Sequence, residues 1–146
     1  MKNRDKYIKK PDAKQGGGVF GSKGDKPGQF NNPWGVAFDS RNQRIIVSNY
    51  CNNRIQLFDK KMKYLNMFGS EGNKLGELRN PTGVCLQPAT NNSIVSDCNN
   101  HRIQVFSNPD DAKESKSLYI VGGPQSSQDY GKFNYPYGVA CNNRGH

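Results

Sequence analysis

The amino-acid sequence predicts an all-β fold assembled from repeated four-stranded antiparallel units. Three observations support this prediction. Apolar residues come in short clusters of strand length, polar turn residues separate the clusters, and two blocks of sequence return at a regular spacing. The composition agrees, because 33% hydrophobic residues together with 16 glycines and 8 prolines suit short strands and many turns better than a helical bundle.

The two repeated blocks define the length of one unit. Their copies lie at residues 28–37, 76–85 and 131–140 for the first block, and at 46–58 and 94–106 for the second. The first two units are offset by 48 residues, from Pro33 to Pro81, and the next offset is 55 residues, to Pro136. The extra residues fall mostly in the polar stretch 108–117, which we expect to be a lengthened surface loop.

Four strands fit into each unit. In the first unit we expect them at residues 35–38, 45–49, 54–58 and 64–68. Asn recurs in the turns because it tolerates the left-handed backbone that tight hairpins need. A four-stranded meander with a period in the forties is typical of a β-propeller blade, since so small a sheet must stack on its neighbours to bury its faces. The predicted fold is therefore a partial β-propeller with two complete blades and the start of a third.

The spacing of the repeats also sets the expected boundaries. These are a basic, disordered N-terminal tail over residues 1–18, a first blade over 19–67, a second over 68–121 and the truncated start of a third over 122–146. Two blades alone leave strand edges and a core face uncovered. We therefore expect the chain to be a fragment, and on its own to be marginally stable or to self-associate through exposed blade edges.

One recurring pattern is more specific than the fold. It consists of Pro-x-Gly-Val, a strand that ends at Asn49 or Asp97, and then Asn-x-Arg-Ile-Gln-(Leu/Val)-Phe. This pattern resembles the NHL repeat and covers residues 19–140. The resemblance implies a propeller of the kind found at the C-terminus of tripartite-motif (RING/B-box) proteins of ubiquitin-ligase type. The first copy departs from the pattern, because Asn49 stands where an acidic residue is usual.

Charge and cysteine content narrow the function classes. The net charge is +9, but nearly half of the excess lies in residues 1–18, so the total says little about nucleic-acid binding. The four cysteines form no Cys-x-x-Cys pair and no zinc-ligand spacing, so we expect reduced thiols, no metal, no cofactor and a cytoplasmic location. We expect no signal peptide and no membrane partner, because no apolar run approaches the length of a membrane span.

Eight residues are candidates for a binding surface. Loops that join strands two and three of each blade share one face with the loops between blades, because strands alternate in direction. We expect that face to carry exposed aromatic and basic residues, the kind of residues that recognise single-stranded RNA or a protein. The candidates are Trp34, Tyr50, Arg54, Arg79, His101, Arg102, Tyr135 and Tyr137.

Structural roles compete with binding roles at several of these positions. Arg54 and Arg102 follow tight turns, where a guanidinium can hydrogen-bond to loop carbonyls or to Asp97. Trp34, Thr82 and Tyr137 occupy one equivalent position, whose varied side chains suit a surface site. Cys51 and Cys98 lie in turns where they could be exposed, whereas Cys85 and Cys141 are expected in the core.

The sequence favours recognition over catalysis. It has no nucleophile elbow and no phosphate-binding loop, so no catalytic residue is assigned. The first hypothesis is a non-catalytic module that binds a protein partner, for instance the substrate of a ubiquitin ligase whose catalytic domains lie elsewhere. The alternative is binding of single-stranded RNA. A third and least favoured hypothesis, a metal-dependent lyase-type enzyme, lacks the histidines and signal peptide that it would need.

Overall fold

The computed structural model describes residues 18–108, 115–123 and 130–142. It confirms an all-β fold of two four-stranded antiparallel sheets, each with its strands in chain order. The first sheet, here the first blade, comprises β1 (Pro33–Asp39), β2 (Arg44–Asn49), β3 (Arg54–Asp59) and β4 (Tyr64–Phe68). The second blade comprises β5 (Pro81–Leu86), β6 (Ser93–Asp97), β7 (Arg102–Phe106) and β8 (Ser117–Gly122).

The four strands expected for the first blade are all present, with ends that differ by at most two residues. The larger difference is at β1, which begins at Pro33 because Pro33 already pairs with Asn49 across an irregularity in the ladder. Bulges of this kind let a strand bend while its pairing continues. The fourth strand, Tyr64–Phe68, has the expected bounds.

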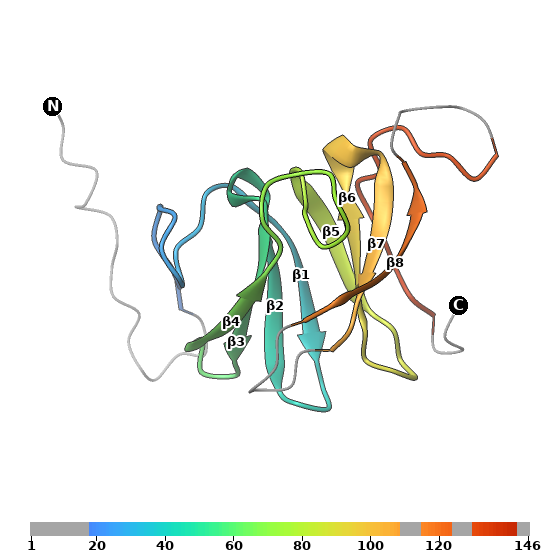
Figure 1. Cartoon of the computed structure of the whole chain (residues 1–146). Helices are drawn as coiled ribbons and strands as arrows, with labels where there is room; N and C mark the ends of the chain where they lie inside the picture. Colours follow the sequence, from blue (N-terminus) through green and yellow to red (C-terminus); the bar gives the residue numbers. More distant parts are fainter. Residues whose placement is uncertain (1–17, 109–114, 124–129, 143–146) are drawn as a thin grey trace, which may run out of the picture.

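A short 3-10 helix joins the second and third strands of each blade. These helices are η2 (Tyr50–Asn52) and η3 (Cys98–Asn100), and each ends at a left-handed residue, Asn53 or His101. Left-handed backbone is what Asn supplies cheaply at such corners. Both helices lie at the same end of the sheets, opposite the β1–β2 and β5–β6 hairpins (Figure 1), so the predicted division of the loops between two faces is confirmed.

The core lies between the two blades, which stand side by side with β1 against β5 (Figure 1). Buried members of the core come from both sheets and from the connection between β4 and β5: Ile46, Ile55, Leu57, Phe68, Leu78, Val84, Val95 and Phe106. Phe68 of the first blade packs on Phe106 of the second with ring centroids 4.7 Å apart. Stacking of blades therefore supplies the core that neither sheet could form alone.

The described part of the third unit runs along the inner strand of the second blade. The backbone N–H of Gly83 in β5 donates to the carbonyl of Tyr137 at 2.8 Å. The division of the chain into blades and a truncated third unit stays a prediction, and the expected N-terminal tail lies almost wholly outside the described residues. Within the described residues, no helix is long and apolar enough to cross a membrane.

Candidate binding surface

Three aromatic side chains from distant parts of the sequence meet at the η2 end of the molecule. Trp34 is the second residue of β1, Tyr50 begins η2, and Tyr137 belongs to the third unit. The ring of Trp34 lies 5.5 Å from that of Tyr50 and 5.8 Å from that of Tyr137, between centroids. We call these three residues the aromatic patch. Trp34 and Tyr137 are 55% and 54% exposed, so much of the patch faces solvent.

Backbone hydrogen bonds fix each part of the patch. The N–H of Tyr50 donates to the carbonyl of Asn32 at 3.2 Å, which ties η2 to the residue two before Trp34. The side-chain amide of Asn80 donates to the carbonyl of Tyr50 at 3.3 Å. Together with the bond from Gly83 to Tyr137, these contacts place three separate segments in one surface.

The three side chains of the patch are of formally uncharged types. Burial, with nearby Cys98 and Tyr137, raises the pKa of the Tyr50 hydroxyl above its ordinary value of 10.0. Burial also raises the pKa of the Cys98 thiol, and the neighbouring Asp97 adds to this effect. Cys98 is 1% exposed, so the expectation that it could be an exposed thiol is wrong, whereas Cys51 is exposed as expected.

The position shared by Trp34, Thr82 and Tyr137 is a surface site in only two of its three copies. Thr82 is fully buried, and its hydroxyl donates to the carbonyl of Pro136 in the third unit at 3.2 Å. Residue size follows this environment, since the buried copy is the small one. The sequence showed the variation at this position but not its cause.

The two candidate arginines are buried and bound to loop carbonyls. Arg102 donates to Asp97 at 2.6 Å and to the carbonyls of Asn73, Lys74 and Glu77 at 2.7, 2.9 and 2.9 Å. Arg54 donates to the carbonyls of Lys26 and Gln29 at 2.9 and 3.3 Å. These are the contacts that a structural role requires, and they leave neither guanidinium facing solvent.

The remaining candidates lie beside the second blade. The ring of His101 stands 4.4 Å from that of Tyr135, and its Nδ1 accepts the backbone N–H of Tyr135 at 3.2 Å. Arg79 is exposed, while its backbone N–H donates to Asp97 at 2.7 Å. The structure thus joins three of the eight candidates in the aromatic patch and pairs two others. Their role in binding stays a prediction.

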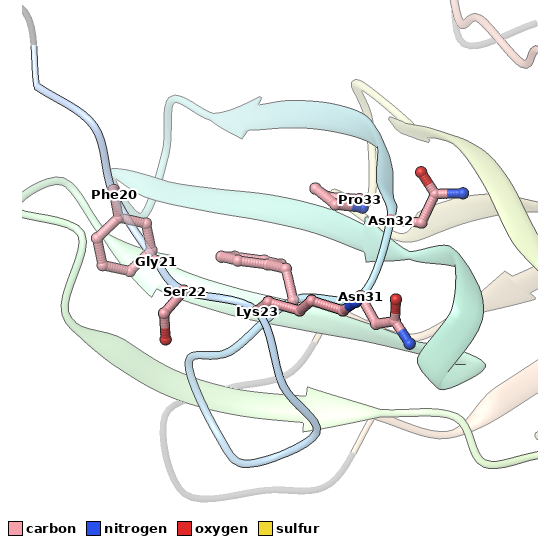
Figure 2. A pocket seen from close by; sticks show the side chains of 8 residues that line it. Phe20, Gly21, Ser22, Lys23, Asn31, Asn32 and Pro33 are labelled. Atoms are coloured by element: carbon pink, nitrogen blue, oxygen red, sulfur yellow. The ribbon is translucent and has the colours of Figure 1, made fainter. Parts of the chain in front are cut away.

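An open groove next to Trp34 was missed by the sequence analysis. Figure 2 shows it between the segment around Phe20 and Ser22 and the start of β1 at Asn32 and Pro33. Its volume is about 510 Å³. The corresponding surface of the second blade is occupied, because Asn53 accepts the backbone N–H of Asn80 there at 2.8 Å. The repeats carry no signal for it, because Asn32 and Asn80 are the same residue at equivalent positions.

The surface at the η2 end is aromatic, with an amide side chain beside it, a composition suited to contact and hydrogen bonding. In the part of the chain that the structure describes, no group of three or more His, Cys, Asp or Glu side chains could hold a metal ion.

Comparison with known proteins finds the repeat that the sequence pattern resembles, the NHL repeat. Residues 30–58 and 78–106 match the family described as the NHL repeat, and these segments span β1 to β3 and β5 to β7. A stretch of 48 residues is 40% identical to Protein lin-41 of Caenorhabditis elegans, covering 33% of this chain and only 4% of that protein. Two segments of the chain therefore match the NHL repeat, and each matched segment forms the greater part of one four-stranded blade.

Proposed function

We propose that the chain is a non-catalytic recognition module that binds a protein partner through the aromatic patch. The observation that carries the proposal is the meeting of Trp34, Tyr50 and Tyr137 in one uncharged, solvent-facing surface. Tryptophan and tyrosine are the residues most enriched at the energetic centres of protein interfaces.

The environment of the arginines favours a protein over RNA. Phosphate contacts supply most of the affinity in nucleic-acid binding, and they need accessible positive groups. Arg54 and Arg102 hydrogen-bond to the protein's own carbonyls instead. Exposed Arg79, together with the exposed rings of Tyr135 and Tyr137, keeps binding of single-stranded RNA as the alternative.

The resemblance to tripartite-motif proteins extends the proposal. In such a protein this module would select the substrate of a ubiquitin ligase, with the transfer of ubiquitin carried out by domains outside this chain. We also propose a cytoplasmic location, which agrees with the four free cysteines. Affinity capture with the full chain, with and without Trp34→Ala, would test the ligase setting, and imaging of the tagged chain would test the location.

Trp34 provides a direct test, because it is the only tryptophan of the chain and its fluorescence reports on the patch alone. The probe is a peptide selected from a random library on the immobilised chain. We expect the peptide to shift the emission of Trp34. We also expect Trp34→Ala to weaken binding by roughly 30-fold, the size of a hot-spot loss, in calorimetric titrations.

Phe38→Ala is the matched control. Phe38 lies on the same strand and is 54% exposed, against 55% for Trp34, but it is at the opposite end of β1. Equal affinities of the two variants for the peptide would show that the aromatic patch is not the site. Tight binding of a random single-stranded RNA pool, lost steeply with salt and with Trp34→Ala, would instead support the RNA alternative.

A further inference from the structure

Two thiols far apart in the sequence lie in contact across the join between the second blade and the third unit. The Sγ atoms of Cys85, in β5, and Cys141 are 3.0 Å apart, although 56 residues separate them in the chain. Both residues are half-buried. Neither belongs to the aromatic patch, and neither is explained by the proposed function.

The backbones near these thiols lie close together. A Cβ placed on Gly83, two residues before Cys85, would lie 2.6 Å from the carbonyl oxygen of Tyr137 and 2.9 Å from the nitrogen of Val139. Hydrogen bonds from Gly83 and Thr82 to Tyr137 and Pro136 hold the same segment against β5. The two Sγ atoms, 3.0 Å apart, need to approach by only about 1 Å to reach the length of a disulfide bond.

We propose that Cys85 and Cys141 form a disulfide bond under oxidising conditions and thereby fasten the third unit to the second blade. The oxidant is a small-molecule disulfide such as oxidised glutathione. In the first step the thiolate of one cysteine attacks a sulfur of the oxidant, and one glutathione leaves as a thiolate that takes up a proton. In the second step the other cysteine, having lost its proton to water, attacks the resulting mixed disulfide and releases the second glutathione. Two protein thiols are oxidised and one glutathione disulfide is reduced to two glutathiones.

The surroundings of Cys85 make its own attack slow. Burial, together with the contact with Cys141, raises the pKa of the Cys85 thiol to about 12. Because the thiolate is the reactive form, we expect the step in which Cys85 attacks to speed up roughly tenfold per pH unit between pH 7 and pH 9.

The disulfide would also act on the aromatic patch, a consequence that rests on the proposed function. Tyr137 lies four residues before Cys141 on the same segment and 5.8 Å from Trp34. A bond at Cys141 restricts that segment before any ligand arrives, and preorganisation of this kind lowers the entropy cost of binding. We expect the oxidised chain to bind the selected peptide several-fold more tightly than the reduced chain.

The test uses the full chain in glutathione redox buffer, followed by acid quenching and mass measurement of the intact protein and its peptides. Cys85 and Cys98 fall in one tryptic peptide, so a second cleavage after Asp97 is needed to separate them. We expect loss of two hydrogens and a cross-linked pair of peptides containing Cys85 and Cys141. Cys85→Ser and Cys141→Ser should abolish the cross-link, and Cys51→Ser, which removes the exposed thiol, should leave it unchanged.

Two further measurements distinguish formation of the disulfide from its effect on the aromatic patch. The oxidised chain should melt at a higher temperature than the reduced chain, because the bond closes a long loop, and the serine variants should show no such difference. An unchanged mass, or glutathione adducts without the cross-link, would overturn the disulfide. A cross-link that leaves peptide affinity unchanged would overturn only its link to the patch, while the proposed function is judged by Trp34→Ala alone.

Discussion

The two blades share one sequence pattern but differ in the residue that ends the second strand and pairs with the buried arginine. In the second blade the carboxylate of Asp97, at the end of β6, accepts hydrogen bonds from Asn100, Arg102 and Gln104 at 2.9, 2.6 and 3.0 Å. In the first blade Asn49 takes this position and pairs with Arg54 in the ladder. Its side chain accepts the backbone N–H of Asn31, as Asp97 accepts that of Arg79, but its amide donates to the carbonyl of Gln29.

This difference affects the hydrogen bonding of Arg54. Its Nε is buried and has no hydrogen-bond partner among the described residues, whereas the equivalent atom of Arg102 is bound to Asp97. A buried donor without a partner is destabilising. The comparison shows that the repeat positions its arginine mainly through loop carbonyls, and that the acidic residue adds a contact which one blade lacks.

The opposite end of the blades shows the reverse arrangement. Asp39 and Arg44 form a buried ion pair of 3.1 Å across the β1–β2 hairpin of the first blade. The residues at the corresponding places of the second blade are Gln87 and Asn92. A buried Asp–Arg pair can therefore form at either end of a blade, and the two blades have it at opposite ends.

Removal of the acidic residue from the second blade should have the largest effect. Asp97→Asn leaves the guanidinium of Arg102 buried without its counter-charge, and we expect a loss of about 3 kcal/mol in the free energy of unfolding. Urea unfolding of the full chain measures this loss. Asp25→Asn, an exposed control in a loop, should change stability little. Similar losses of unfolding free energy in the two variants would mean that the negative charge of Asp97 adds nothing to stability.

A second contrast concerns the faces of the inner strands. Val84 of β5 is 7% exposed because the first blade covers it, whereas Val36, at the same place in β1, is 68% exposed. We expect Val84→Ala to cost about 2 kcal/mol and Val36→Ala less than about 0.5 kcal/mol in urea unfolding. A large cost at Val36 would indicate that its face is covered in solution, and sedimentation would then reveal the self-association that exposed blade edges predict.

The sequence predicted the strands well because each depends on local signals. Alternating apolar residues, turn residues and the repeat itself located all four strands of the first blade. The repeat also predicted the shared face of η2 and η3, since strand direction alone determines it. The burial of Cys98 and Thr82 was not predictable, because it depends on which segment of another unit covers them. The same is true of the contact between Trp34 and Tyr137 in the aromatic patch, because Trp34 lies in the first unit and Tyr137 in the third.

The reverse substitution in the first blade should give a smaller gain. Asn49→Asp supplies an acceptor near the unpaired Nε of Arg54 and imitates the second blade. The amide of Asn49 loses its bond to Gln29, but Arg54 and Gln56 continue to donate to that carbonyl. We expect a gain of about 1 kcal/mol in unfolding free energy, measured with urea. The gain should vanish in an Arg54→Met background, and its persistence there would assign it to another cause.

The smallest effect is the acid response of the first blade, which depends on Asp39. Burial raises the pKa of this carboxyl, but hydrogen bonds from Asn42 and Arg44 outweigh burial, so the pKa in the folded chain lies below its ordinary value of 3.8. The folded state therefore holds the ionised form more firmly than the unfolded chain does. The resulting stability is complete above the unfolded pKa, about 4, and is lost as the pH falls through the lower folded value.

We expect Asp39→Asn to flatten the fall in unfolding free energy below about pH 4 relative to the unchanged chain, in urea titrations at successive pH values. Parallel curves for the two chains would show that the ion pair at this hairpin does not contribute to the acid sensitivity of the first blade.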